Sequence, residues 1–174
     1  MWKSKFTAYL KRCFNRKFVV KATAFCAVTF SLGSALAYSS YSIAFETQNV
    51  IRCLPQVLWI LDSDVHPENI HKGSLVKLNG ANYNSYFDEK TYLLKMVVAI
   101  EGDVVFIDQS QRTLYINDVF YGKLASDKQP AHTGKYVLQK SEIWIAGTSD
   151  TTLDSRYFGP ATLGQIEAHA YAVL

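Results

Sequence analysis

The stretch "LLKMVVAI", residues 93–100, decides the fold, because seven of its eight residues are apolar and the third is a lysine. Aliphatic and β-branched residues in a run of this length favour a strand. Residues two apart share a face of a strand, so Lys95 lies on the same face as Leu93 and Val97. The opposite face is apolar as well. We therefore expect a strand with no obvious wet side and a charge within it.

Two interpretations of Lys95 are open at this point. Its stem can pack along apolar neighbours while the ammonium extends to solvent. Alternatively the head group ends in a partly desolvated place, where the charged form is disfavoured. A neutral amine can accept a proton, which makes Lys95 a candidate general base.

Runs of the same kind lie on both sides of this stretch. They are short, rich in β-branched and aromatic residues and separated by turn signals such as Gly102-Asp103. No long helical period follows residue 47. The expected strands are 74–79, 91–100, 104–108, 113–117, 136–139, 142–147 and 166–174. The sequence predicts a mainly β domain, a barrel or a folded sheet, with a polar loop over 123–135.

The N-terminal region has the pattern of a membrane anchor. Residues 22–43 carry no charge and are numerous enough to cross a bilayer as a helix. Because every charged residue before Glu46 is basic, we expect the N-terminus in the cytoplasm and the rest of the chain outside. This gives a basic cytoplasmic arm over 1–21, a single-pass anchor over 22–43 in the cytoplasmic (inner) membrane and a periplasmic domain over 44–174.

A cleaved secretory signal is the alternative to the anchor, since "ALA" at residues 35–37 resembles a cleavage site. Both interpretations export the C-terminal domain. The basic arm abuts the apolar segment and suits anionic lipid, so nucleic acid is not an expected partner.

Of the three cysteines, Cys13 lies in the basic arm, Cys26 in the apolar segment and Cys53 alone in the exported domain. No disulfide within that domain is possible. Cys53 is therefore either a buried, inert cysteine or a reactive nucleophile. A cysteine–histidine enzyme is one alternative, with four histidines available. The four histidines are His66, His71, His132 and His169. They lack the spacing of metal ligands, so no metal and no cofactor is expected.

Three segments follow the apolar segment in this order along the chain: "RCLPQVLW" (52–59), "LKMVVAIEGDVV" (94–105) and "TLDSRYFGP" (152–160). Together they resemble the membrane-bound signal peptidases of the S26 family, which use a serine–lysine dyad. Within that family they are similar to the TraF-type peptidases of conjugative transfer. In that group the nucleophile is followed by one residue and then proline, as in Cys53-Leu54-Pro55.

The resemblance implies a role for five residues. Cys53 takes the place of the nucleophilic serine and Lys95 that of the general base. Thr152 takes the place of a serine whose hydroxyl orients the lysine. Asp154 and Arg156 match a pair that braces the site, although a structural salt bridge is an equally good interpretation of them. The implied fold is a signal-peptidase-like β domain tethered by one transmembrane helix.

Three positions depart from the family's pattern. Cysteine replaces serine at Cys53, and Val57 stands where the conjugative group tends to have glycine. Ile51 has no hydroxyl, so it cannot supply the second oxyanion donor that some relatives place there.

The implied substrate is a membrane-embedded precursor, in particular a conjugative pilin. A cysteine nucleophile would form a thioester, whose acyl group can pass to water or to the pilin's own N-terminus.

Two alternatives to this function remain. The chain can be an inactive, membrane-tethered relative that binds pilin or the transfer apparatus. Ser63 can be considered as nucleophile, but its proline follows four residues later and does not fit the pattern.

Overall fold

The structure is a computed structural model that describes residues 16–45, 53–83, 86–87 and 91–173. The chain divides into two compact units, Met1–Ser39 and Ser40–Leu174. The first contains helix α2 and the second contains all the described strands.

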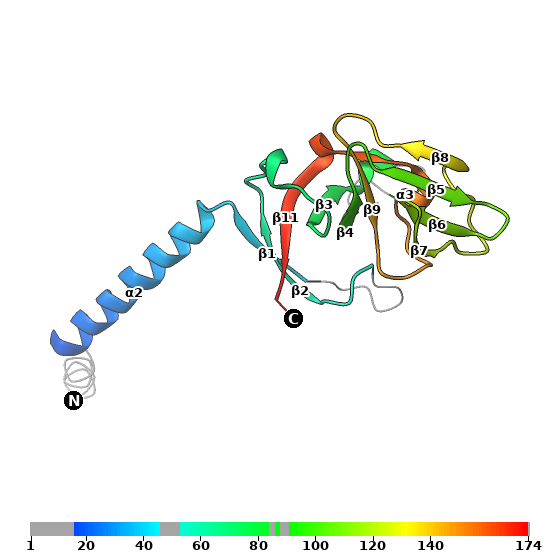
Figure 1. The fold of residues 1–174 in the computed structure, drawn as a ribbon. Helices are drawn as coiled ribbons and strands as arrows, with labels where there is room; N and C mark the ends of the chain where they lie inside the picture. The colour runs from blue at the N-terminus through cyan, green and yellow to red at the C-terminus, as the bar shows by residue number, and fades with distance from the viewer. Residues whose placement is uncertain (1–15, 46–52, 84–85, 88–90, 174) are drawn as a thin grey trace. The chain divides into compact units, whose positions relative to one another are not determined.

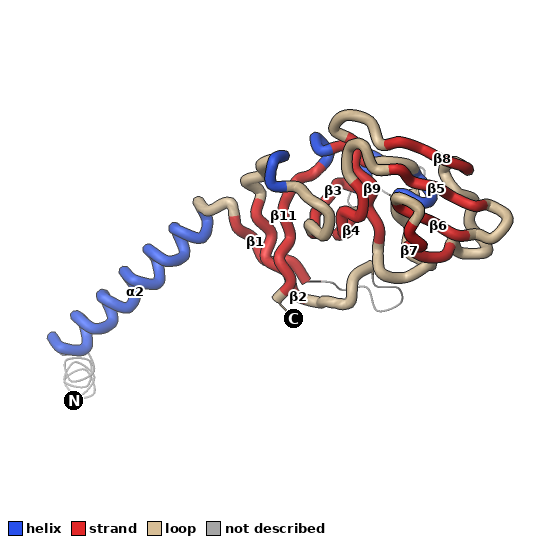
Figure 2. Tube along the Cα trace, viewed as in Figure 1, coloured by secondary structure: helices blue, strands red, loops and turns tan. Residues whose placement is uncertain are grey.

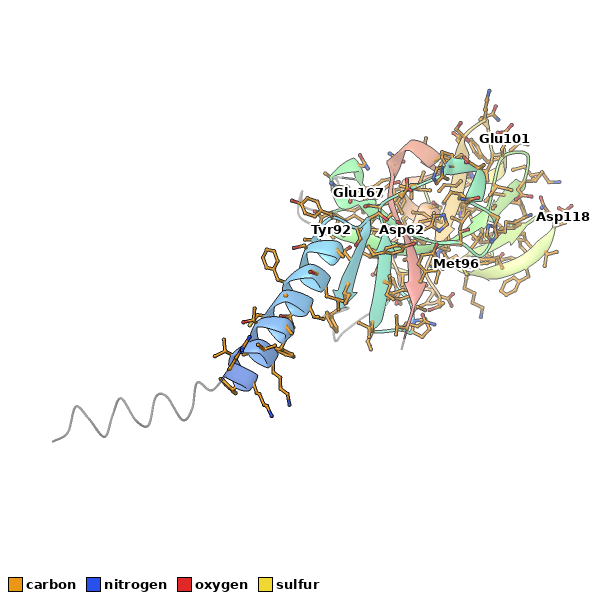
Figure 3. All side chains as sticks on the ribbon, turned by 90° about the vertical axis from the view of Figure 1, so that its left-hand side faces the viewer. Asp62, Tyr92, Met96, Glu101, Asp118 and Glu167 are labelled. Atoms are coloured by element: carbon orange, nitrogen blue, oxygen red, sulfur yellow. The ribbon has the colours of Figure 1, made fainter. Side chains whose placement is uncertain are left out.

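Helix α2 spans Arg16–Ala37 (Figure 1), and most of its described side chains are exposed (Figure 3). Residues Arg16–Ala35 have a mean hydropathy of 1.5 and are long and apolar enough to cross a membrane, as an anchor or a signal would. The helix covers most of the expected anchor, but residues 41–43 lie in a strand. Serines after Ala37 favour a turn over a helix, and the alternating Tyr41 and Ile43 favour a strand.

The second unit consists of two antiparallel sheets (Figures 1 and 2). The seven-stranded sheet has the order β1-β2-β11-β3-β4-β9-β10, and the four-stranded sheet has the order β7-β6-β5-β8. Its strands are β1 (Tyr41–Phe45), β2 (Leu58–Asp62), β3 (Leu75–Asn79), β4 (Tyr92–Ala99), β5 (Val104–Asp108), β6 (Thr113–Ile116), β7 (Val119–Lys123), β8 (Gly134–Val137), β9 (Glu142–Ala146), β10 (Ala161–Thr162) and β11 (Ile166–Ala172). The expectation of a mainly β domain is confirmed.

Short helical turns complete this unit: η1 (Pro67–Asn69), η2 (Gly80–Tyr83), α3 (Ser155–Phe158) and η3 (Leu163–Gln165). Every run expected to be a strand overlaps one, although the run 136–139 shares only Tyr136 and Val137 with β8. Four strands were not anticipated, namely β1, β2, β7 and β10. The expected loop over 123–135 is shorter than predicted, because Lys123 ends β7 and Gly134 begins β8.

Strand β4 occupies an inner position of the large sheet, between β3 and β9. The face that carries Lys95 is fully covered: Leu93, Lys95 and Val97 are at most 4% exposed. Leu94 and Met96 on the opposite face are half-buried. The sequence-based expectation of two apolar faces therefore holds, but only one of them is sealed from solvent.

The turn after β4 sends the chain from the large sheet into the small one. Gly102 adopts a positive φ of 84°, which glycine tolerates without strain. Asp103 accepts hydrogen bonds from the Ile100 N–H, from Lys72 Nζ and from Asn117 Nδ2. Burial works to raise the pKa of Asp103, but these hydrogen bonds outweigh it and the pKa is lowered. The carboxylate thereby ties the turn to both sheets.

The core beneath the Lys95 face sets the stability of the domain. Val76 is 0% exposed and Val119 is 69% exposed. We expect Val76→Ala to lower the free energy of unfolding by about 2 kcal/mol, because it removes buried methyl groups and leaves a void. Val119→Ala is the matched control and should change it by less than about 0.5 kcal/mol. Urea unfolding of both variants measures the difference, and equal losses would contradict the described core.

Candidate active site

Cys53 and Lys95 meet although they come from different parts of the domain. Lys95 lies in the middle of β4, whereas Cys53 lies before β2. Lys95 Nζ donates a hydrogen bond to Cys53 Sγ over 2.7 Å. Lys95 is 0% exposed, and it is paired with Val76 on the adjacent strand β3. The lysine therefore does not extend to solvent, and its head group ends at the thiol.

The thiol is the accessible half of this pair. Cys53 is partly exposed, while Leu54 after it is only 5% exposed and packs with Trp59 and Leu61. The buried leucine fixes the chain on one side of the thiol. A partly exposed cysteine therefore contacts the amine of a lysine that has no exposed surface.

Thr152, Asp154 and Arg156 form a second polar group, each at most 2% exposed. Arg156 Nε donates to Asp154 Oδ1 over 2.8 Å and Nη2 donates to Oδ2 over 2.6 Å, so the contact is two-pronged. Burial opposes the charge of Arg156, but hydrogen bonds and the charge of Asp154 raise its pKa above the ordinary value. Asp154 also caps helix α3 by accepting from the Arg156 N–H.

The position of Thr152 differs from the expectation that its hydroxyl contacts the lysine. The hydroxyl lies 2.9 Å from both Ser149 O and Asp154 Oδ2 and accepts from Arg156 Nη2 over 3.0 Å. Among the described residues, none of its hydrogen bonds reaches Lys95. A carboxylate and a guanidinium are stronger partners for a hydroxyl than an amine that already bonds a thiol.

Gly147, directly after β9, joins the two groups. Its N–H donates to Asp154 Oδ2 over 3.0 Å. A side-chain carbon at this position would lie 2.6 Å from Thr152 Oγ1 and 2.8 Å from the Cys53 carbonyl oxygen. Sequence reasoning treated Gly147 only as the end of a strand. A glycine that ends a strand can indicate close approach of another backbone, and this was the available signal.

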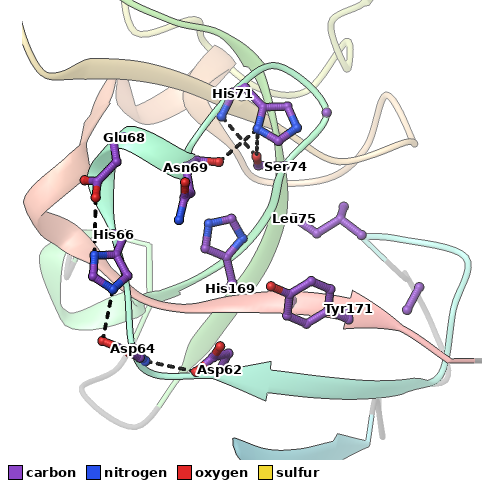
Figure 4. Close-up of a pocket in the computed structure, with 13 residues that line it drawn as sticks. Asp62, Asp64, His66, Glu68, Asn69, His71, Ser74, Leu75, His169 and Tyr171 are labelled. Carbon is purple, nitrogen blue, oxygen red and sulfur yellow. Dashed lines mark hydrogen bonds and ion pairs between the residues drawn. The ribbon is translucent and has the colours of Figure 1, made fainter. Parts of the chain in front are cut away.

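The histidines lie elsewhere. His66, His71 and His169 line a cavity of about 770 Å³ together with carboxylates (Figure 4), and neither Cys53 nor Lys95 lines it. His132 packs edge-on against a tryptophan instead. Burial lowers the pKa of His132 and of His169, in the second case against the opposing charge of an aspartate.

The described residues hold no group of three or more His, Cys, Asp or Glu side chains arranged to bind a metal. In the described part of the chain, the hydrogen-bond partner of the Cys53 thiol is an amine, not an imidazole. Ser63 donates its hydroxyl to Ser40 O over 3.0 Å, which gives it a structural role. Ile51 lies outside the described residues, so its missing hydroxyl stays a sequence observation.

Comparison with known proteins shows the family of the chain. The profile of the family described as signal peptidase, peptidase S26, matches residues 16–174. The chain belongs to this family, and membership implies a peptidase with a membrane-associated protein substrate. Among solved structures, signal peptidase I from Enterococcus faecalis V583 is similar, with 14% identity and a TM-score of 0.40 over 58% of this chain and 96% of that one. No curated protein matches the sequence.

The close approach at Gly147 can be tested by adding one methyl group. We expect Gly147→Ala to destabilise the domain by roughly 1–3 kcal/mol, because the methyl meets Thr152 and the Cys53 main chain. Gly164→Ala is the control, since nothing lies within 4 Å of a side-chain carbon there. Thermal unfolding compares the two. A Gly147→Ala variant as stable as Gly164→Ala would show that the two groups do not meet at this residue.

Proposed function

We propose that this signal peptidase family member is a membrane-anchored endopeptidase that uses a Cys53–Lys95 dyad. The observation that carries the proposal is the 2.7 Å contact between the thiol and an amine with no solvent exposure. A lysine removed from water and paired with a nucleophile fits a general base better than a surface charge.

The chemistry follows from this contact. Lys95 Nζ accepts the thiol proton, and Cys53 Sγ attacks the scissile carbonyl to form a tetrahedral oxyanion. The Cys53 N–H is a donor for that oxyanion. Collapse breaks the peptide C–N bond, the lysine returns its proton to the leaving amine, and a thioester remains on Cys53. Water, deprotonated by Lys95, then releases the acid and restores the thiol.

A cysteine nucleophile lowers the proton affinity that the base Lys95 must have. A thiol ionises more readily than a serine hydroxyl, so less proton affinity is needed from the lysine. Two states of the pair compete, thiol with amine and thiolate with ammonium. Apolar neighbours favour the neutral pair, and the short contact favours the ion pair. Both states lead to the same attack.

The buried Asp154–Arg156 pair supports the dyad without joining the chemistry. Its two charges offset each other, so the polar group beside Cys53 adds little net charge to the site. Its contact with the Gly147 N–H positions the end of β9 next to the nucleophile. In this proposal Asp154 and Arg156 brace the site, and Thr152 acts through them.

The proposed substrate is a membrane-embedded precursor, in particular a conjugative pilin. Support comes from the Cys53-Leu54-Pro55 pattern, which resembles the TraF-type group, and from an apolar helix that precedes the nucleophile by a short length of chain. With the basic residues before this helix in the cytoplasm, α2 anchors the chain in the inner membrane. The catalytic domain is then periplasmic.

Cleavage of a pilin precursor in membrane vesicles tests the dyad. We expect Cys53→Ala to abolish cleavage and Lys95→Met to slow it by roughly 10²-fold or more, since general-base catalysis is lost. Lys77→Met is the matched control on the neighbouring strand and should cleave normally, because Lys77 pairs with Glu167 instead. Undiminished cleavage by Lys95→Met would refute the dyad. Binding of pilin without cleavage by the wild type would favour the inactive relative.

A second candidate outcome, ring closure, is favoured by the cysteine itself. A thioester reacts with amines more readily than an ester does, so the acyl group can pass to the pilin's own N-terminus. That step forms an amide bond and releases the Cys53 thiol. We expect purified enzyme and pilin to yield a product lighter than the linear peptide by one water, as measured by mass spectrometry. Linear product alone would leave the hydrolytic peptidase and exclude cyclisation.

A further inference from the structure

We infer that Thr148 is a positioning residue that holds the main chain of Cys53 at the end of β9. The inference rests on the proposed role of Cys53 as nucleophile and adds a residue that the family resemblance did not single out. Thr148 follows Gly147 directly and is exposed, so composition and burial alone give it no importance.

Both hydrogen-bond donors of Thr148 bond to the same atom. Its N–H donates to the Cys53 carbonyl oxygen over 2.8 Å, and its hydroxyl donates to the same oxygen over 3.3 Å. The two residues are 95 positions apart in the chain, so the contact is a tertiary link and not a local turn. A carbonyl oxygen has two lone pairs and can accept both bonds.

This contact fixes the thiol because the cysteine side chain is short. Sγ is attached to Cβ, and one rotatable bond separates it from the main chain. The position of the main chain therefore decides whether Sγ reaches Lys95. With the carbonyl of Cys53 held by Thr148 and Leu54 buried, the chain is held at the nucleophile and just after it. Geometry of this kind decides the rate of attack, since misplacement by 1 Å can cost about 10²-fold.

Lys95 and Thr148 reach Cys53 from neighbouring parts of one sheet. Strand β4, which carries Lys95, pairs with β9 through Met96–Ala146 and Val97–Ile145. Thr148 lies two residues beyond the end of β9. Strand β4 and the turn after its neighbour β9 thus hold the two ends of the nucleophilic residue, its sulfur by Lys95 and its carbonyl oxygen by Thr148.

The buried polar group supports Thr148 in turn. The Gly147 N–H donates to Asp154, whose carboxylate is fixed by Arg156. The absence of a side chain at Gly147 lets the Cys53 carbonyl approach this turn. The Asp154–Arg156 pair therefore acts on the nucleophile through Gly147 and Thr148, which explains how residues that do not touch the thiol brace it.

The test compares three variants of the full chain in detergent: Thr148→Val, Thr148→Ser and Thr151→Val. Thr148→Val removes the hydroxyl and keeps the shape and the N–H, and Thr148→Ser restores the hydroxyl. Thr151→Val is the same change in the same loop, where the hydroxyl bonds with Ser149 Oγ. We expect Thr148→Val to lower kcat for precursor cleavage roughly fivefold to tenfold with KM unchanged. Thr148→Ser and Thr151→Val should match the wild type.

The midpoint of thermal unfolding should be the same in all three variants, because the Cys53 carbonyl keeps its main-chain partner. Equal kcat values for Thr148→Val and Thr151→Val would overturn the inference, as would a loss of kcat accompanied by a lower unfolding midpoint. Cys53→Ala, assayed alongside, distinguishes failure of the proposed function from failure of the role of Thr148. If that variant still cleaves, the proposed function fails. If it is inactive and Thr148→Val is normal, only the role of Thr148 fails.

Discussion

The contact between the amine of fully buried Lys95 and the thiol of partly exposed Cys53 is the interaction on which the rest of the site depends. Lysine is rarely buried without a partner, because removing an ammonium from water costs free energy. In the described residues the partner of Lys95 is the sulfur of Cys53. The sheet makes this possible by placing Lys95 on an inner strand, where Leu93, Val97 and Val76 exclude solvent. The position of Lys95 on an inner strand is thus the structural cause of its burial.

A second constraint keeps the sulfur where the amine can reach it. Cys53 lies outside the strands, so its position relies on tertiary contacts with Thr148 and with the apolar cluster around Leu54. The Asp154–Arg156 pair is too deeply buried to meet substrate. A buried ion pair adds little net stability, and the role of this one is geometric, since Asp154 holds the Gly147 N–H close to the main chain of Cys53.

Much of this arrangement could be predicted from sequence. The apolar run around Lys95 predicted a strand with two apolar faces, the Gly102-Asp103 pair predicted the turn after it, and three ordered segments indicated the family. The contacts of Gly147 and Thr148 could not be predicted, because they join residues distant in the chain and involve main-chain atoms. Thr152 was assigned a contact by resemblance, whereas stronger polar partners nearby bind its hydroxyl. The helix ends at Ala37, before the expected end of the anchor at Ile43, because the serines that follow favour a turn.

The proximity of the two reactive atoms can be measured directly with ortho-phthalaldehyde, which forms a fluorescent isoindole only when a thiol and a primary amine lie within reach of one reagent molecule. In a folded chain that carries Cys13→Ser and Cys26→Ser, so that Cys53 is the remaining thiol, we expect isoindole fluorescence that disappears when either Cys53→Ala or Lys95→Met is added. Fluorescence that persists with Lys95→Met, or that is absent from the folded chain with Cys53 and Lys95 intact, would contradict the contact between Cys53 and Lys95.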